Sequence, residues 1–195
     1  MNSTLLVGIV LTAGLVALIV YLVGIYNVLV RLANNIDKAW SNIDVILKQR
    51  HDELPKLVHV CNSYMTHERD TLEAITKARI AYRHGVNIDD KAQAENQLVG
   101  ALGKLFAIAE QYPDLKANQE FLAIHQRISA LESTIADRRE FYNDSVNLYN
   151  IAIEQIPTLW VAQQVGYTAR PLLEIAASDR EDIHLKFSNR ASAAA

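Results

Sequence analysis

The chain contains a single cysteine, Cys61, among its 195 residues. An intrachain disulfide is therefore excluded, and this use of cysteine fits a reducing compartment. The segment after residue 30 also has no run of glycine, serine and proline of the kind that forms a flexible linker. We therefore expect the helix that begins near the N-terminus to continue into the following domain without a joint.

Charge is absent from the first 30 residues. The apolar run of residues 5–30 exceeds the roughly 20 residues with which a helix crosses the ~30 Å hydrocarbon layer of a bilayer. A cleaved signal would need a basic start, a shorter apolar stretch and a small-residue cleavage site, and the sequence has none of these. A buried core helix would show a polar stripe, whereas the polar residues here are scattered. We expect residues 1–30 to be a transmembrane anchor.

The distribution of basic residues favours one orientation. No Lys or Arg precedes the span, whereas Arg31 and Lys38 follow it closely. Basic residues near a span are retained on the cytoplasmic side, so we expect the main domain to be cytoplasmic. Asp37 lies beside Lys38 and weakens the preference, so the opposite side of the membrane stays open.

Signatures of catalysis and of nucleic-acid binding are missing. The net charge is −3, with acidic and basic residues interleaved, which disfavours a nucleic-acid partner. His67 and Glu68 begin a zinc-protease motif, but Thr71 stands where the second histidine is needed. A di-iron bundle needs two Glu-x-x-His motifs, and the chain has one, from Glu181 to His184. We expect no catalytic residue, no metal site and no cofactor.

Apolar residues recur at steps of three and four and predict long helices. The first pattern runs from the span to Ile75, and Pro55 within it predicts a kink or short break at residues 50–53. Residues 83–90 are predicted to form a loop, in which Gly85 ends one helix and Asp89 or Asp90 caps the next.

Two further helices and a short one complete the predicted fold. A helix over residues 91–111 is expected to end at a tight turn, after which Asp114 caps a long helix over residues 115–154. A short helix over residues 159–165 follows. The predicted fold is therefore all-α: a transmembrane helix that continues into an elongated antiparallel bundle of three to four long helices, over residues 31–168. Residues 169–195 are expected to be a flexible C-terminal tail.

Four charged residues occupy positions at which the three-four spacing demands an apolar side chain. They are Arg50, Glu68, Glu95 and Arg138. All four are expected to point into the bundle, where a charge costs several kcal/mol unless it is paired, which predicts an interior ion network. The network could set the register of the helices, the long side chains could reach out to solvent, or the cluster could bind a ligand.

Several stretches of the chain resemble those of the LemA family, in order and over residues 25–168. They are YNVLVRLANNIDKAWSNIDVILKQRHDELPKLV, HERDTLEAITKAR, ENQLVGALGKLFAIAEQYPDLKANQEF and RREFYNDSVNLYNIAIEQIP. The resemblance implies a bacterial protein with one N-terminal helix in the inner membrane and an elongated helical bundle, and it carries over no catalytic residues. The residues from Leu172 onward match no pattern of the family.

The family-like stretches include two Tyr-Asn pairs. Tyr142 and Asn143 lie seven residues before Tyr149 and Asn150, so the pairs share one stripe of a helix. Asparagine on an interior stripe can set helix register and the number of chains in an assembly.

Three classes of function follow from the sequence. The first is a self-associating scaffold in membrane organisation, which a magnetosome-building relative in the family supports; its partners would be membrane lipids and further copies of the chain. The alternative is an accessory or adaptor subunit of a membrane protease or another envelope complex, as family genes often neighbour those of membrane proteases. The third is a ligand sensor that uses the four charged residues.

Overall fold

The computed structural model describes residues 3–173, which form six helices and no strand. The prediction of an all-α fold is confirmed. The helices are α1 (Ser3–Asn62), α2 (Arg69–His84), α3 (Ile88–Ala109), α4 (Pro113–Lys116), α5 (Gln119–Glu154) and α6 (Thr158–Val165).

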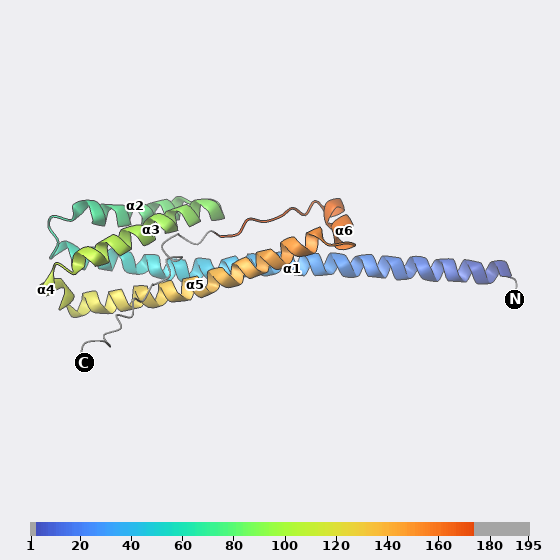
Figure 1. The fold of residues 1–195 in the computed structure, drawn as a ribbon, viewed down its shortest axis with the longest axis horizontal. Coiled ribbons are helices and arrows are strands. Elements are labelled where there is room, and N and C mark those ends of the chain that lie inside the picture. The colour runs from blue at the N-terminus through green and yellow to red at the C-terminus, as the bar shows by residue number, and fades with distance from the viewer. Residues whose placement is uncertain (1–2, 174–195) are drawn as a thin grey trace, which may run out of the picture.

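Helix α1 is the axis of the molecule (Figure 1). Its 60 residues extend over about 90 Å at 1.5 Å per residue. The N-terminal part is apolar enough to cross a membrane, with a mean hydropathy of 2.8 in its best window, and none of that window is buried. Leu29 is the first fully buried side chain, and from there the rest of the bundle packs on α1. The continuation of the apolar helix into the bundle without a joint is as predicted.

A kink or short break was predicted at residues 50–53, and the break is wrong, because α1 continues through these residues with Pro55 inside the helix. A proline lacks the N–H that would bond to the carbonyl oxygen four residues earlier, here that of His51. Arg79 of α2 supplies the missing donor: its Nε donates to the His51 carbonyl oxygen over 3.1 Å. A neighbouring helix therefore satisfies the acceptor that the proline leaves free.

The predicted continuation of the first helix to Ile75 is also wrong. Helix α1 ends at Asn62, and a turn over residues 63–68 leads into α2. Met65 in this turn is buried, and its N–H donates to the carbonyl oxygen of Cys61 over 2.8 Å. The burial of Met65 at the end of the bundle fixes the position of the turn. Because this burial depends on residues distant in the sequence, the helical spacing could not predict it.

Helix caps differ in detail from those predicted. Asn87 caps α3 by accepting from the N–H of Asp90 over 2.7 Å, and the Asp90 carboxylate accepts from the N–H of Val86. The cap is therefore Asn87, and the Asp90 side chain binds the residue before it. Asp114 lies within the short helix α4, and Asn118 caps α5, which begins at Gln119 and not at residue 115.

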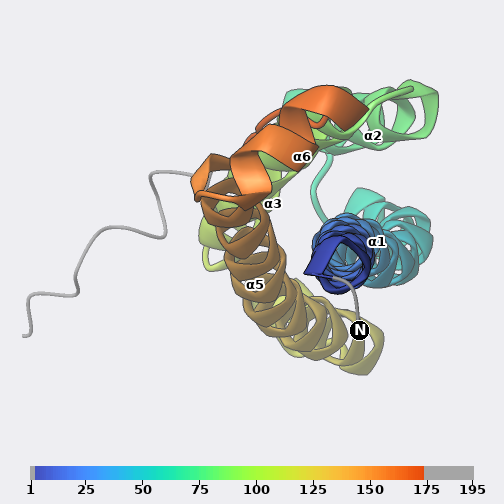
Figure 2. The same ribbon diagram turned by 90° about the vertical axis from the view of Figure 1, so that its right-hand side faces the viewer.

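The helices form an elongated antiparallel bundle, as predicted. Helices α1 and α5 run in opposite directions side by side over most of their shared length, and α2 and α3 form a helical hairpin over the end far from the N-terminus (Figure 1). Helix α6 contacts both α1 and α5 at the other end of the bundle. Seen from the N-terminal side, α6 lies across the end of the bundle (Figure 2).

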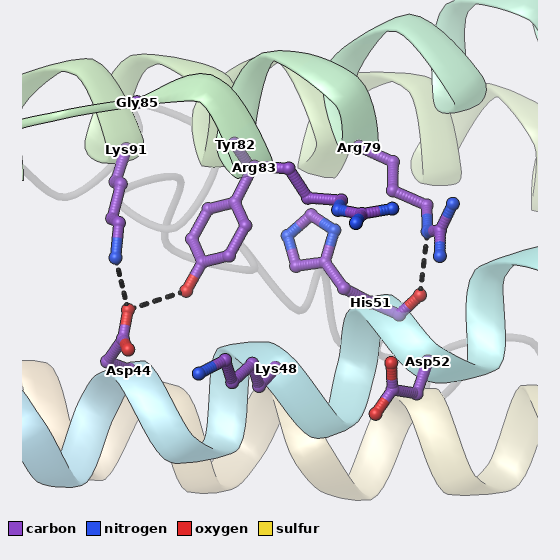
Figure 3. A pocket seen from close by; sticks show the side chains of 9 residues that line it. All are labelled: Asp44, Lys48, His51, Asp52, Arg79, Tyr82, Arg83, Gly85 and Lys91. Atoms are coloured by element: carbon purple, nitrogen blue, oxygen red, sulfur yellow. Dashed lines mark hydrogen bonds and ion pairs between the residues drawn. The ribbon is translucent and has the colours of Figure 1, made fainter.

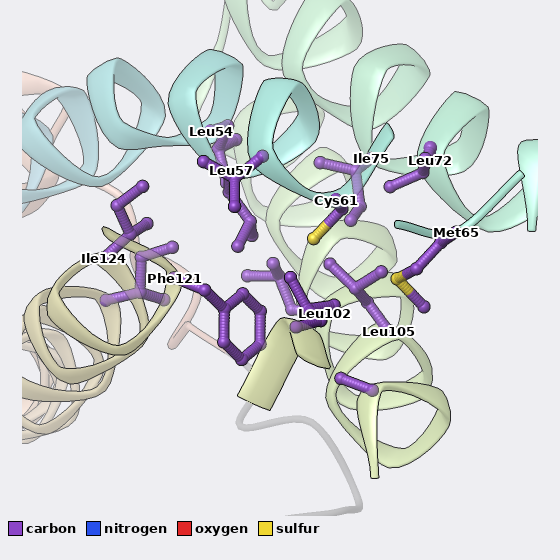
Figure 4. Packing of buried hydrophobic residues seen from close by; sticks show 14 of the residues in the cluster. Leu54, Leu57, Cys61, Met65, Leu72, Ile75, Leu102, Leu105, Phe121 and Ile124 are labelled. Atoms are coloured by element: carbon purple, nitrogen blue, oxygen red, sulfur yellow. The ribbon is translucent and has the colours of Figure 1, made fainter. Parts of the chain in front are cut away.

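The buried apolar residues divide into two clusters along the bundle. The distal core joins α1, α2, α3 and α5 far from the N-terminus (Figure 4). The proximal core lies nearer the apolar end of α1. The distal core comprises Leu54, Leu57, Val60, Cys61, Met65, Leu72, Ile75, Ala78, Leu98, Leu102, Leu105, Ala109, Leu115, Phe121, Ile124 and Ile128; the proximal core comprises Leu29, Ala33, Ile36, Ala39, Ile43, Leu47, Tyr82, Ala94, Ile135, Tyr142, Val146, Tyr149, Ile153, Ala162 and Leu173.

Candidate functional site: a charged layer between the two cores

Charged side chains separate the distal core from the proximal core. On α1 the division falls between Leu47 and Leu54, and Arg50 occupies it with 1% of its surface exposed. Glu95 of α3, also 1% exposed, makes a close ion pair with Arg50 Nη2. Glu132 of α5 accepts from Arg50 Nη1 over 2.5 Å and is 36% exposed. One arginine thus joins three helices through two carboxylates.

His51 completes this charged layer, which we define as Arg50, His51, Glu95 and Glu132. The imidazole stacks on Tyr82 with ring centroids 4.1 Å apart, and its Nε2 lies 2.5 Å from Glu95 Oε1. Burial, Arg50 and Arg79 lower the pKa of His51 to about 3. The ring is therefore neutral near pH 7, Nε2–H donates to Glu95, and Nδ1 carries no proton. Within the described residues, buried Nδ1 has no hydrogen-bond partner.

A second polar group adjoins the layer on the α2 side. The hydroxyl of Tyr82 donates to Asp44 Oδ1 over 2.8 Å, and Lys91 Nζ donates to the same oxygen over 2.6 Å. Burial alone would raise the pKa of Asp44, but the hydrogen bonds from Lys91 and Tyr82 outweigh it and lower the pKa. Burial and the Asp44 carboxylate raise the pKa of Tyr82, so the phenol stays protonated.

These groups line a cavity of about 530 Å³ between α1 and α2 (Figure 3). Arg79 and Arg83 reach into it from α2, and Lys48 from α1. A second cavity, of about 470 Å³, borders Arg50 and Glu132 and is lined mainly by residues of α5. Over residues 3–173, no group of three or more histidine, cysteine, aspartate and glutamate residues is arranged to hold a metal ion. Glu95 and Glu132 are tied to Arg50, so neither is poised as a free base.

The structure brings together two of the four charged residues named from the sequence. Arg50 and Glu95 lie in the interior and pair, where the spacing places them. Arg138 is exposed, so its predicted interior position is wrong; its neighbour Arg139 is half-buried and lines the second cavity. Glu68 lies half-buried at the start of α2, outside the charged layer, and makes none of the ion pairs seen in the described part of the chain.

Two members of the charged layer, Glu132 and His51, were not predicted from the sequence. Glu132 lies four residues after Ile128 and three before Ile135, so the three-four spacing could have named it; Leu131 satisfies the same pattern with the other step. His51 follows Arg50 directly and faces a second direction. A helix packed against α5 on one side and α2 on another needs two buried stripes, and a single spacing reveals only one of them.

The two asparagines of the Tyr-Asn pairs bind the backbone of the segment that follows α6. After α6 the chain turns at Gly166, whose φ is +80°, and returns along α5. The Asn150 amide donates to the carbonyl oxygen of Arg170 over 2.9 Å and accepts from its N–H over 2.9 Å. Asn143 does the same with Leu173, over 3.1 and 2.8 Å. We call this pair of contacts the asparagine clamp.

The spacing of the clamp matches the geometry of both partners. Seven helical residues span about 10.5 Å, and three extended residues span about 10 Å. Tyr149, buried between the two asparagines, donates its hydroxyl to the carbonyl oxygen of Thr168 over 3.1 Å. Tyr142 is also buried and packs edge-on against Trp40 at 6.2 Å. The first five residues of the segment expected to be a flexible tail are therefore described and packed on α5; residues 174–195 lie outside the described part of the chain.

Comparison with known proteins places the sequence among relatives of one family. The sequence model of the LemA family matches residues 39–187. Protein LemA of Metamycoplasma hominis is 30% identical over 163 residues, which cover 83% of this chain and 74% of that protein. Magnetosome protein MamQ of Magnetospirillum gryphiswaldense is 26% identical over 180 residues, 79% of this chain and 66% of that protein. Magnetosome protein MamQ 2 of Paramagnetospirillum magneticum is 34% identical over 74 residues, 38% of this chain and 27% of that protein.

The matched range corrects one expectation from the sequence. It extends to residue 187, so the view that residues from Leu172 onward match no pattern of the family is wrong up to that point. The family description and the names of these relatives indicate no catalytic activity. With its exposed apolar helix, the protein is membrane-associated. The family match covers more than half of the chain, and the chain therefore belongs to the LemA family.

Proposed function

We propose that this protein is a non-enzymatic, single-pass membrane protein that acts as a self-associating helical scaffold in membrane organisation. The observation that carries the proposal is the unbroken course of α1 from Ser3 to Asn62. The same helix supplies the apolar span and the central element of the bundle, and packing on it begins at Leu29. An anchor continuous with its domain transmits orientation, because a rigid helix has no joint at which the domain could swivel.

Self-association is supported by an apolar stripe on the outside of α5. Phe141, Leu148 and Ile151 are 54%, 60% and 44% exposed, and their spacing of seven and three is that of the apolar seam of a coiled coil. The seam position between them, three residues after Phe141 and four before Leu148, is occupied by Asp144. This outer stripe gives a second copy a surface on which to pack.

The basic residues support a cytoplasmic bundle on a bacterial inner membrane. Arg31 and Lys38 follow the span, and both are exposed on α1 where the bundle begins. Residues 1–30 carry no charge. Because the side with more Lys and Arg stays in the cytoplasm, the bundle lies there and the N-terminus lies outside.

The relatives named as magnetosome proteins support membrane organisation as the setting of the scaffold. In the alternative, an adaptor function, a different membrane protein, such as a membrane protease that the chain assists, would occupy the outer stripe in place of a second copy. These two occupants are distinguished by the mass of the purified protein.

The deciding measurement is the mass of the full-length protein in detergent, by native mass spectrometry or by light scattering with the detergent subtracted. A scaffold gives a discrete multiple of 21.8 kDa. Leu148→Glu should reduce the measured mass to that of the monomer, since the substitution places a charge on the outer stripe. Ile80→Glu is the matched control, because Ile80 is a 48% exposed isoleucine on α2, away from the stripe. A wild-type monomer would overturn self-association and favour an adaptor whose partner was lost on purification.

A further inference from the structure

Helix α6 and the residues around it form a segment without charge. No Asp, Glu, Lys or Arg occurs in residues 155–169. Large apolar side chains are nevertheless exposed there: Ile156 is 70% exposed, Trp160 62% and Val165 46%. In a surface helix of a soluble protein, exposed positions carry mainly charged and polar residues. The exposed side of this segment is therefore unusual for a surface that meets only water.

The position of α6 links this surface to the membrane span. Helix α6 packs on α1 at the end of the bundle where the exposed apolar part of α1 gives way to buried residues; Ile25 is half-buried and Leu29 fully buried. Seen from the side of the span, α1 points towards the viewer, and α6 lies beside it and roughly perpendicular to its axis (Figure 2). A helix that packs roughly perpendicular to a membrane-spanning helix at this level lies along the membrane surface.

We propose that Ile156, Trp160 and Val165 insert into the headgroup region of the bilayer that α1 crosses, so that α6 is a second, interfacial contact with lipid. The inference rests on α1 spanning the membrane, but not on self-association. Two points of attachment fix the tilt of the bundle relative to the membrane, which a single helix leaves free to vary.

Lipid is favoured over a second protein chain as the occupant of this surface. Helix α6 contacts α1, the helix whose N-terminal part exposes apolar side chains and carries Tyr21 and Tyr26, 55% and 42% exposed. Tyrosine and tryptophan gather at membrane interfaces, because one end of each ring system is apolar and the other hydrogen-bonds to water. The segment has no basic residue to attract anionic lipid, so its insertion depends on apolar area alone.

The chain supplies its own control, since its two tryptophans lie at different levels. Trp40 lies nine residues beyond Arg31, the first charged residue after the span, or about 14 Å further along α1. It is half-buried against Tyr142. Trp40→Phe leaves Trp160 as the only indole, and Trp160→Phe leaves Trp40.

The test is fluorescence quenching of the two full-length variants, each in vesicles of zwitterionic phosphatidylcholine with or without bromine on the acyl chains. We expect brominated lipid to lower the emission of Trp160 at least about twofold, because an interfacial indole lies within reach of the acyl chains. The emission of Trp40 should not change. Addition of anionic lipid should leave the quenching of Trp160 unaltered.

Equal, negligible quenching of both tryptophans would overturn the proposal. If Trp160 were then also shielded from a water-soluble quencher, a second protein chain would be its occupant. Flotation of both variants with the vesicles tests the span separately, since a chain that does not float has failed to insert α1. Failure of the interfacial contact is thereby distinguished from failure of the membrane anchor.

Discussion

The charged layer makes a measurable prediction through Arg50→Met, which keeps an unbranched apolar stem and removes the charged guanidinium. The variant removes the guanidinium that pairs with the Glu95 carboxylate, which stays buried at 1% exposure beside the neutral His51. Breaking one side of a buried ion pair costs about 3–5 kcal/mol. The contact with Glu132 adds little, because that carboxylate is 36% exposed and screened by water. In a chain of this size the loss lowers the melting temperature by roughly 6–20 °C.

The assay is thermal unfolding of the full-length protein in mild detergent, followed by far-ultraviolet circular dichroism. Arg138→Met is the matched control, because Arg138 is exposed on α5 and its replacement should change stability by less than about 0.5 kcal/mol. The double variant Arg50→Met with Glu95→Met should lose less than Arg50→Met alone, since no uncompensated charge remains. Equal melting temperatures for the two single arginine variants would refute the reasoning, as would additive losses in the double variant.

A further variant, Arg50→Ala, tests the hypothesis that the protein is a ligand sensor. A sensor built on the charged layer would lose ligand binding in Arg50→Ala while keeping its fold. If Arg50→Ala only lowers the melting temperature, the layer is a structural device that holds α1, α3 and α5 in register, and the sensor hypothesis fails.

Three further outcomes are expected. The pKa of His51 is about 3 in the folded chain and about 6.5 when unfolded, so the unfolded state binds more protons between these pH values, and the free energy of unfolding should fall by about 2 kcal/mol from pH 7 to pH 5. In His51→Gln this pH dependence should disappear from chemical unfolding curves, and its persistence would show that another group causes it. Asn143→Ala and Asn150→Ala should each accelerate hydrogen exchange in residues 167–173, whereas the exposed Asn147→Ala should not, and equal rates in all three would contradict the clamp. Burial raises the pKa of the Cys61 thiol to about 11, so a maleimide should label it only after unfolding, and rapid labelling of the folded protein would contradict its burial.

Much of the architecture follows from the sequence by itself. A helix in a bundle buries one face against its neighbours, so apolar residues that recur at steps of three and four predict both the helices and their buried sides. On that basis Arg50 and Glu95 were expected in the interior, and both are there. The uncharged N-terminal run and the absence of a linker likewise predict a span that continues into the bundle. Both features depend on the length of the apolar run and on helix propensity, which are properties of the local sequence.

The tertiary structure decided which interior groups meet. Arg138 and Arg139 both satisfy the spacing after Ile135, and only the packing of α5 against α1 leaves the first exposed and the second half-buried. The end of α1 at Asn62 depends on the burial of Met65, and its continuity past Pro55 depends on a donor from α2. The backbone that Asn143 and Asn150 bind lies some 20 to 30 residues further along the chain. Contacts between distant segments leave no periodic trace in the sequence, because each depends on where another element comes to rest.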